Sequence, residues 1–467
     1  MPNHKNPKKN ILIILILSLF FLTNLSLLFF QENIWWDSAV YIGMGKYAYS
    51  SGDSGLWEAS RPLAWPLITG FFWKLGFGIL FFRILSLFFA VACIYLVYSI
   101  AENIFNRKIA LFSALFLAFS PTFYFFSTSM LSEMPSLFFA LLSVYFFINK
   151  KYFFAGLLSG IAFMARFLQL FVFMALFIIL LSYFRKDRQF FKYISKFLIG
   201  FLIILTPYLT LNYILYSNAL YPFILQKFLT ENTGFVFHQP FWFYFLSLLK
   251  ENYLLIASIP GFYFLMKSMK NHKKSAIALI FLAYFIFLSF IRHKEMRIFM
   301  IAMPYLYIIL AFSLDHVIKK IKPKNTLSLL FIILIFSIWL LQSFANIYFL
   351  EYNEINTKNK HQIFQDYLEK ENADNIWISS PVSAVFSDKK INELIYYPAF
   401  NAEKFNQIKH NINHANHVLL DACDIACEPV ALSCQEEKSE FLNLLKNNFN
   451  AVYYNKIGAC EQFIFRK

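Results

Sequence analysis

The chain has 467 residues, of which 59% are hydrophobic, 21% are aromatic and only 15% are charged. A soluble domain typically has about 25% charged and 45–50% apolar residues, and folding still leaves much of its surface in contact with water. These proportions exclude a cytosolic enzyme, a disordered chain and a nucleic-acid-binding module. Most of this protein is therefore expected to lie in lipid.

The net charge of +15 is unevenly distributed along the chain. Residues 1–350 contain 30 Lys and Arg against 11 Asp and Glu, a net charge of +19, whereas residues 351–467 have a net charge of −4. Basic residues between apolar runs are typical of the loops that orient a membrane protein. This interpretation is favoured over a basic patch for nucleic acid, so no nucleic-acid partner is expected.

Apolar runs that are long enough to cross a bilayer recur through the first 350 residues. We expect about eleven transmembrane helices, near 11–30, 80–100, 109–128, 134–149, 152–165, 167–184, 197–216, 246–266, 275–291, 298–318 and 326–349. No small-residue cleavage site follows the first of these, which is therefore expected to remain as an anchor.

Six basic clusters fall at every second loop between these spans. They are Lys5/Lys8/Lys9, Arg107/Lys108, Lys150/Lys151, Arg185 to Lys196, Lys267 to Lys274 and Lys319 to Lys324. The positive-inside rule places such loops in the cytoplasm. We therefore expect a multi-pass protein of the cell membrane with a cytoplasmic N-terminus and an extracytoplasmic C-terminal segment.

The composition changes abruptly near Glu351. Beyond it, short β-like runs alternate with polar helical stretches at 361–372 and 436–448; the runs are 376–378, 394–397, 417–420, 452–454 and 463–465. This alternation predicts a small α/β domain over 351–467. The membrane domain would occupy residues 1–350 and include a long first outer loop at 31–79.

Four of the five cysteines lie in the C-terminal segment, namely Cys423, Cys427, Cys434 and Cys460. An even number outside the membrane favours two disulfides. Spacing does not determine the pairing, and Cys423–Cys427 with Cys434–Cys460 is one arrangement. Metal ligation by these cysteines, or by a helical face of His410, His414 and His417, is the alternative.

Ionisable side chains cluster at the ends of spans that are expected to face outward. These groups are Asp37 and Arg61 in the first outer loop, Glu133 after the third span, Arg166 after the fifth, and Arg292, His293, Lys294, Glu295 and Arg297 after the ninth. Charges at membrane depth are costly, so each is a functional candidate.

The chemistry of these groups is complementary. Asp37 and Glu133 are carboxylates in apolar, aromatic settings that suit proton transfer, and they are the candidate catalytic residues. The arginines and Lys294 can hold a phosphate. Together they fit a reaction in which an acceptor hydroxyl loses its proton and attacks the anomeric carbon of a sugar on a lipid-linked phosphate.

Each group also has a simpler interpretation. Arg292, Lys294 and Arg297 could extend to lipid headgroups as interfacial anchors. Glu133 precedes a predicted helix, where an acid favours the helix dipole, and Asp37 could be a helix N-cap.

Three motifs resemble those of the GT-C superfamily of membrane glycosyltransferases. Asp37-Ser38-Ala39-Val40-Tyr41 with Arg61-Pro62-Leu63-Ala64-Trp65-Pro66 is similar to the first-loop pattern of the protein O-mannosyltransferase and aminoarabinose-transferase-like branch. Ser132-Glu133-Met134-Pro135 is similar to its second acidic motif, where Asp is more usual. His293-Lys294-Glu295-Met296-Arg297 is similar to the HKExR motif of the dolichyl-phosphate-mannose-dependent mannosyltransferases.

The resemblance implies a polytopic α-helical enzyme that uses a polyprenyl- or dolichyl-phosphate sugar as donor. It implies that Asp37 is the catalytic base and that Arg61, Arg166 and the 293–297 segment bind the lipid phosphate. Some relatives use a divalent metal, which Asp37 and Glu133 could ligate. Because the chain mixes motifs of two branches, the hexose (mannose being one candidate) and the acceptor (glycan, glycolipid or protein hydroxyl) stay open.

Two other classes of protein remain. A transporter or flippase of a lipid-linked anionic sugar would also need cations on the outer side, although transporters usually have polar groups at the bilayer midplane and helices broken by Gly or Pro. Here the charges cluster at span ends and Gly totals 13. A membrane scaffold that presents the C-terminal domain to a partner is the second alternative.

Overall fold

The computed structural model describes residues 11–467, except for 233–236, 269, 322–325, 357–359, 397–401, 426, 428–431 and 459. The cluster Lys5/Lys8/Lys9 and the end of the cluster at 319–324 lie outside the described residues. The chain divides into two compact units. The membrane unit comprises Met1–Gln31, Leu80–Leu211 and Gln239–Thr357, and the second unit comprises Glu32–Ile79, Asn212–His238 and Lys358–Lys467.

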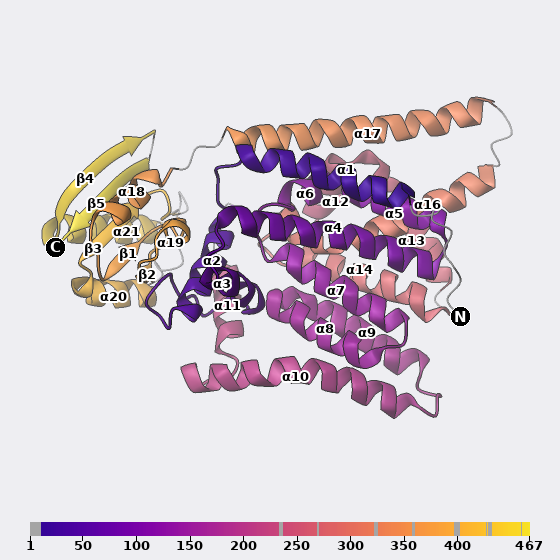
Figure 1. Cartoon of the computed structure of the whole chain (residues 1–467), viewed down its shortest axis with the longest axis horizontal. Coiled ribbons are helices and arrows are strands. Elements are labelled where there is room, and N and C mark those ends of the chain that lie inside the picture. The colour runs from indigo at the N-terminus through magenta and orange to yellow at the C-terminus, as the bar shows by residue number, and fades with distance from the viewer. Residues whose placement is uncertain are drawn as a thin grey trace. The chain divides into compact units, whose positions relative to one another are not determined.

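Six segments of the described chain are helical, long and apolar enough to cross a membrane: Ile11–Phe30, Ile79–Ile104, Phe190–Tyr216, His272–Phe290, Met296–Lys319 and Ile333–Ile355. They correspond to α1 (Ile11–Leu27) with its 3-10 extension, α4 (Ile79–Ile104), α10 (Phe190–Tyr216), α14 (His272–Phe290), α15 and α16 (Met296–Phe299 and Met303–Ile321), and α17 (Thr326–Ile355). Shorter apolar helices include α7 (Glu133–Ile148), α8 (Tyr152–Ala165) and α9 (Leu170–Tyr183). Neighbouring helices of this unit run side by side (Figure 1), with α7 on α8 and α16 on α5 (Arg107–Ala118). The polytopic α-helical fold predicted from the sequence is confirmed.

Two of the expected spans are interrupted. The run at 109–128 splits into α5 and the short α6 (Pro121–Phe126), and the run at 246–266 splits into α12 (Phe243–Glu251), a 3-10 turn and α13 (Ser258–Lys267). The two breaks meet at Glu251, whose carboxylate accepts hydrogen bonds from the Ser120 hydroxyl at 2.7 Å and from the Thr122 amide at 3.0 Å. A helix end leaves polar groups that lack a hydrogen-bond partner within the helix. Glu251 accepts hydrogen bonds from such groups where the helix is interrupted.

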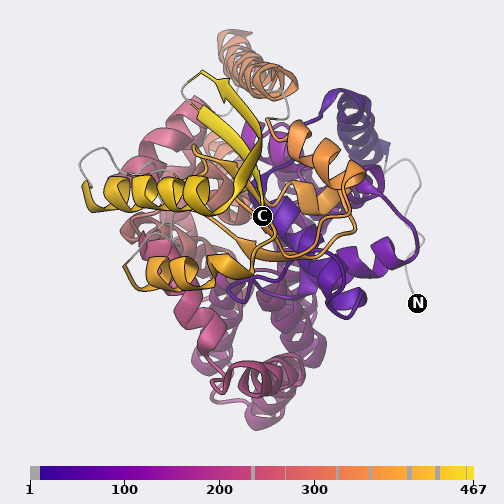
Figure 2. The ribbon, with the colours of Figure 1, turned by 90° about the vertical axis from the view of Figure 1, so that its left-hand side faces the viewer.

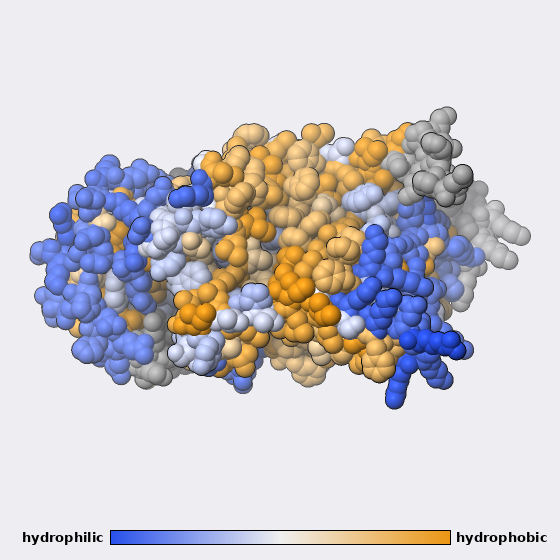
Figure 3. Space-filling view, turned by 60° about the horizontal axis from the view of Figure 1, so that its bottom comes forward, coloured by the Kyte–Doolittle hydropathy of each residue, from blue (hydrophilic) through white to orange (hydrophobic). Residues whose placement is uncertain are grey.

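The outer surface of the membrane unit is apolar. On α1, six large aliphatic side chains are at least half exposed: Ile11, Leu12, Ile14, Leu15, Leu19 and Leu22. In the space-filling view, hydrophobic side chains form a broad band over the helices (Figure 3). Such a surface is stable in lipid and would be insoluble in water.

The second unit contains a five-stranded sheet of strand order β2-β1-β3-β5-β4. The strands are β1 (Ile376–Ile378), β2 (Ile391–Leu394), β3 (His417–Asp421), β4 (Asn450–Ile457) and β5 (Cys460–Arg466). The first three are parallel, and β5 pairs antiparallel with both β3 and β4. The small α/β domain is present as predicted, although β2 begins three residues before the expected run at 394–397, of which Tyr397 lies outside the described residues.

Helices cover both faces of this sheet (Figure 2). One face packs on α20 (Ala402–Asn411) and α21 (Leu432–Asn448), through side chains such as Phe405 and Phe441. The other face packs on α18 (Gln362–Lys370), α19 (Ser383–Phe386) and α2 (Trp36–Tyr49), the last through Val40 and Met44. The first outer loop therefore belongs to the same core as the C-terminal domain. The domain boundary expected at residue 350 separates these two segments, which share one core.

Polar contacts also join the outer loop to the C-terminal domain. The buried ammonium of Lys46 on α2 lies 2.9 Å from Asp388 and donates a hydrogen bond of 2.8 Å to the carbonyl of Val385. Gly55 forms backbone hydrogen bonds with Lys389 and Ile391, at the edge of β2. It has φ +77°, and a Cβ there would lie 2.1 Å from the Gly43 carbonyl oxygen, so this position requires glycine.

The cysteine pairing differs from the arrangement suggested by spacing. Cys423 is joined to Cys460, and Cys427 to Cys434. The expected pairs Cys423–Cys427 and Cys434–Cys460 are wrong because Cys423 follows β3 and Cys460 begins β5, and these two strands are antiparallel neighbours. Proximity across the sheet decides this pairing.

The predicted helical face of histidines is also wrong. His410 lies on α20, His414 lies in a 3-10 turn (Ile412–His414), and His417 begins β3. His417 instead forms a 2.9 Å hydrogen bond through Nδ1 with the hydroxyl of Tyr367. The change from helix to strand after residue 414 separates these side chains.

Candidate active site

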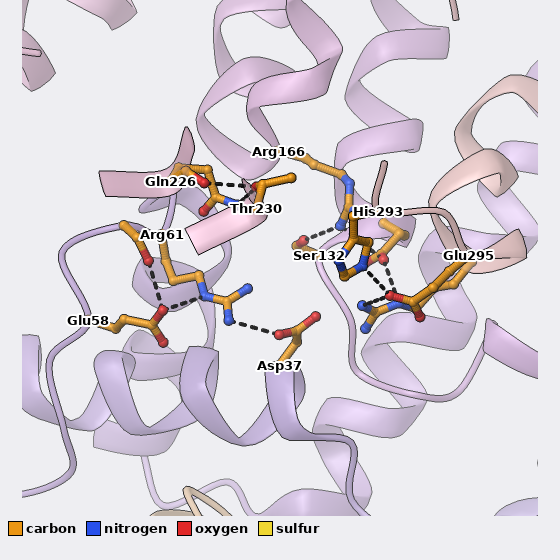
Figure 4. A network of polar contacts seen from close by, with 12 residues as sticks. Asp37, Glu58, Arg61, Ser132, Arg166, Gln226, Thr230, His293 and Glu295 are labelled. Carbon is orange, nitrogen blue, oxygen red and sulfur yellow. Dashed lines mark hydrogen bonds and ion pairs between the residues drawn. The ribbon is translucent and has the colours of Figure 1, made fainter. Parts of the chain in front are cut away.

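The candidate base Asp37 lies in the first turn of α2, in the second unit. Its carboxylate is 2.9 Å from the guanidinium of Arg61, which also lies 3.2 Å from the carboxylate of Glu58 (Figure 4). The N-cap position of α2 is occupied by Trp35, without a side-chain capping bond, so the N-cap interpretation of Asp37 is wrong. Asp37 is instead the ion-pair partner of an arginine that lies 24 positions further along the chain.

Arg61 is held as a permanent cation. Burial by itself would lower the pKa of Arg61, but the negative charges of Asp37 and Glu58 outweigh it and hold that pKa well above its ordinary value. The guanidinium also lies 5.7 Å from the centre of the Tyr41 ring, within the range of a cation–π contact. The side chains of Asp37 and Arg61 remain 17% and 18% exposed, so both can be reached by a ligand.

An aromatic residue from the C-terminal domain completes this cluster. The ring of Tyr396 lies 5.7 Å from that of Trp36, which precedes Asp37. Burial, with the neighbouring negative charge of Glu58, raises the pKa of Tyr396, although the charge of Arg61 acts in the opposite direction. Sequence reasoning missed Tyr396, because 359 positions separate it from Asp37 and only the fold brings them together.

The second acidic residue, Glu133, begins α7 in the membrane unit. Its carboxylate lies 2.9 Å from Arg166, at the end of α8, and 3.5 Å from Arg297. Arg166 also donates a 3.4 Å hydrogen bond to Ser132 (Figure 4). The Glu133 side chain is 1% exposed, whereas those of Arg166 and Arg297 are 15% and 12% exposed. This arrangement favours a carboxylate that positions two arginines over one that contacts substrate.

The predicted motif at 293–297 connects α14 to α15. His293 Nε2 lies 2.7 Å from the carboxylate of Glu295, which is also 3.5 Å from Arg297. Glu295 thus links the histidine to the arginine that pairs with Glu133. The motif and the Ser132-Glu133 motif form one connected cluster within the membrane unit.

Lys294 of this motif and Arg292, which directly precedes the motif, have different surroundings. The buried ammonium of Lys294 donates hydrogen bonds to the carbonyls of Gln239, at 2.8 Å, and Ile291. Burial lowers the pKa of Lys294. These contacts favour a structural role for Lys294 over the predicted phosphate contact. Arg292 is exposed and remains available to an anion.

A further buried network in the membrane unit was missed from the sequence. Arg83 on α4 donates a 3.1 Å hydrogen bond to the amide oxygen of Gln31, whose amide nitrogen donates one of the same length to Glu351 on α17. Arg83 is 5% exposed. The signal that could have found it is an arginine within the apolar run at 80–100, since a charge in a span is a functional candidate.

The structure therefore contains the predicted site residues as two clusters, each described within its own unit. Asp37 and Arg61 belong to the second unit, and the residues from Glu133 to Arg297 belong to the membrane unit. Asp37 and Glu133 are each paired with guanidinium groups, and a divalent metal ligated by these carboxylates stays a prediction. Among the described residues, no group of three His, Cys, Asp or Glu side chains with metal-ligand spacing includes Asp37 or Glu133.

Solved structures of similar fold are membrane glycosyltransferases. The crystal structure of ArnT from Cupriavidus metallidurans bound to undecaprenyl phosphate is 12% identical in sequence, with a TM-score of 0.69 over 97% of this chain and 98% of that one. The archaeal oligosaccharyltransferase AglB from Archaeoglobus fulgidus, in complex with an inhibitory peptide and a dolichol-phosphate, is 12% identical, with a TM-score of 0.60 over 97% of this chain and 74% of that one. The arabinofuranosyltransferase AftD from Mycobacteria is 11% identical, with a TM-score of 0.53 over 96% of this chain and 41% of that one.

The polytopic helical fold is shared with these GT-C glycosyltransferases. Residues 9–384 match the model of one particular family, and the chain belongs to the Alg9-like mannosyltransferase family. No curated protein matches the chain. The expected class, a membrane glycosyltransferase, is confirmed, and the roles of the individual site residues stay predictions.

Proposed function

We propose that this enzyme transfers a hexose, mannose in the first instance, from a polyprenyl- or dolichyl-phosphate carrier to a hydroxyl of a glycan, glycolipid or protein. Membership of the Alg9-like mannosyltransferase family supports the sugar. ArnT and AglB, whose folds are similar, are seen with undecaprenyl phosphate and dolichol-phosphate, which supports the carrier. The distribution of basic loops supports transfer on the outer face of the cell membrane, with a cytoplasmic N-terminus.

The observation that carries this proposal is the accessible Asp37–Arg61 pair. Asp37 is a carboxylate, partly exposed, at the beginning of a helix that packs on a folded domain, so its position is fixed and its oxygens are reachable. The adjacent guanidinium lies 2.9 Å from the carboxylate, so the carboxylate is held in a defined orientation before the acceptor binds. An exposed loop carboxylate without such a partner would lack this preorganisation.

In the proposed reaction, Asp37 accepts the proton of the acceptor hydroxyl as the hydroxyl oxygen bonds to the anomeric carbon. The bond from that carbon to the phosphate oxygen breaks, and its electron pair leaves with the polyprenyl phosphate. Negative charge on the departing phosphate increases in the transition state, where arginines stabilise it most. Arg61, Arg166 and Arg297 are the candidates for this role, with Arg292 as an accessible further cation.

The experiment that tests the function is a transfer assay on the full chain in lipid nanodiscs. Polyprenyl-phosphate mannose, with the glucose analogue for comparison, is supplied with simple glycoside acceptors, and both the labelled product and the released polyprenyl phosphate are measured. Equal amounts of product and released carrier would support the proposal. Movement of the intact donor across a vesicle membrane without release of sugar would contradict it and support the flippase alternative.

A further inference from the structure

A cluster of potential metal ligands lies at one edge of the sheet in the second unit. His361, directly before α18, faces Asp421 at the end of β3 and Asp424 in the following turn. The imidazole Nε2 and one carboxylate oxygen of each aspartate all lie within 4.8 Å of one another. The proposed transfer reaction uses none of these residues.

The position of this cluster in the topology is that of a ligand site. β1 lies between β2 and β3, so the chain leaves β1 toward one side of the sheet and returns on the other side. The carboxyl ends of the parallel strands β1 and β3 flank this switch point, where open α/β sheets bind their ligands. Asp421 ends β3, and Ser379 and Ser380 follow β1 directly.

The two separations from the imidazole of His361 are close to those of ligands around a shared ion. His361 Nε2 lies 3.3 Å from Asp424 and 3.7 Å from Asp421. Ligand atoms about 2.0–2.2 Å from a tetrahedral metal lie roughly 3.4 Å from one another, whereas a charge-assisted hydrogen bond is about 2.7–2.9 Å long. The pair His293–Glu295, at 2.7 Å, shows the shorter distance in the same molecule.

Outer contacts hold each of the three side chains in place. The second ring nitrogen of His361 is 3.3 Å from the Ser380 hydroxyl, and Asp424 accepts a 2.7 Å hydrogen bond from Ser379. Asp421 accepts from the Cys423 amide and from the side chain of Gln462, both at 2.9 Å. Support of this kind orients the ligands in metal sites, and a ligating histidine characteristically engages its other nitrogen.

The nearby ammonium of Lys438 interacts electrostatically with Asp421 and Asp424, but it donates hydrogen bonds to backbone carbonyls. The ammonium of Lys438 is held by the carbonyls of Ala422, at 2.5 Å, and Ile425, at 2.9 Å. Gln462 is 1% exposed, and its amide oxygen has no hydrogen-bond partner among the described residues. The amide nitrogen of Gln462 donates to Asp421, so this residue contacts the cluster directly.

We propose that His361, Asp421 and Asp424 bind a divalent transition-metal cation, Zn²⁺ or Mn²⁺, in the C-terminal domain. One imidazole and two carboxylates suit these ions, whereas Ca²⁺ and Mg²⁺ prefer oxygen ligands alone. The ion ties the start of α18 to the end of β3 and to the turn that the Cys423–Cys460 disulfide fixes. It leaves at least one coordination position for water.

The test is metal binding by the purified full chain, stripped with a chelator and then titrated with Zn²⁺ or Mn²⁺. The proposal predicts about one ion per chain by mass spectrometry of the metal, and affinity at least tenfold weaker in His361→Gln and in Asp424→Asn. The matched control is His414→Gln, which removes an exposed histidine of the same domain and should bind normally. Equal binding by all four proteins, or no binding to the wild type, would overturn the proposal.

Two further measurements guard against loss of folding and against binding elsewhere. Ser380→Ala removes only the outer contact of His361 and should weaken binding about 10–100-fold, with an unchanged unfolding temperature in the absence of metal. Substitution with Co²⁺ should give the visible bands of nitrogen and oxygen ligation. An intense thiolate charge-transfer band would place the ion on cysteines and would also overturn the proposal.

Discussion

The carboxylate of Glu133 lies 2.9 Å from the guanidinium of Arg166 while its side chain is 1% exposed. A catalytic base must reach the proton that it removes, and a carboxylate enclosed between two arginines does not. Glu133 is better explained as the residue that positions Arg166 and Arg297. Asp37, the other candidate catalytic residue from the sequence, has a side chain that is 17% exposed and can be reached by a substrate.

Replacing Glu133 by Gln should destabilise the protein and weaken donor binding. Two guanidinium groups would lose their buried counter-charge, and breaking a buried pair in this way typically costs about 3–5 kcal/mol. The KM for the lipid-linked donor should rise, with partial rescue by Glu133→Asp. Glu102→Gln, which removes a carboxylate bonded to Tyr98 elsewhere in the unit, is the control and should leave KM unchanged. A loss of kcat at unchanged KM and stability would instead support a catalytic role.

Lys294→Met should affect stability more than donor affinity. Its ammonium bonds to two carbonyls, so the substitution leaves the Gln239 and Ile291 carbonyls without their donor. Each buried polar group that loses its partner costs about 1–3 kcal/mol. Thermal unfolding and the donor KM of the folded fraction separate these effects. A large increase in KM at unchanged stability would restore Lys294 to the phosphate-binding set, and Arg292→Ala provides the exposed comparison.

The stability contributed by Lys46 should depend on pH. Burial lowers the pKa of Lys46 below its ordinary value of 10.5, although Asp388 raises it by a smaller amount. The unfolded chain therefore binds more protons at this residue than the folded chain does, and stability rises with pH between the folded pKa and 10.5. The free energy of unfolding of the wild type and of Lys46→Met is measured from pH 7 to 10. The stability of the wild type should increase relative to that of the variant as the pH rises. A constant difference would mean that the lysine titrates normally.

The two disulfides should contribute unequally to stability. The Cys423–Cys460 bridge closes a separation of 37 residues and the Cys427–Cys434 bridge one of 7. On the chain-entropy model the longer loop stabilises by about 4 kcal/mol and the shorter by about 2.5 kcal/mol. Paired Cys→Ser substitutions compared by unfolding measure the difference, and peptide mapping without reduction reads the pairing directly. Recovery of a Cys423–Cys427 peptide would contradict the structure.

The sequence predicted the fold class and the small C-terminal domain because both depend on local patterns. Long apolar runs and alternating short strands are visible in any window of the chain. The membership of the first outer loop in the C-terminal core was not predictable in this way. It depends on Val40 and Met44 of α2 meeting the sheet at Ile376 and Ile378, more than 330 positions away.

The site was also predicted only in part: the sequence identified individual residues but not the contacts between them. Asp37, Arg61, Glu133 and Arg166 were recognisable as charges beside apolar runs. Their pairing was not, because the contacts Asp37–Arg61 and Glu133–Arg166 span 24 and 33 positions. Tyr396 and the ligand cluster at Asp421 depend on the sheet topology, and no local motif marks them.

The central claim is that Asp37 is the general base, and Asp37→Asn tests it most directly. The variant keeps the size of the side chain and removes its basicity, while Glu58 remains beside Arg61. The account predicts that transfer by Asp37→Asn falls by about 10²–10⁴-fold, with donor binding within about threefold of wild type and with Glu58→Gln remaining active. Transfer by a folded Asp37→Asn protein at the wild-type rate would contradict the account.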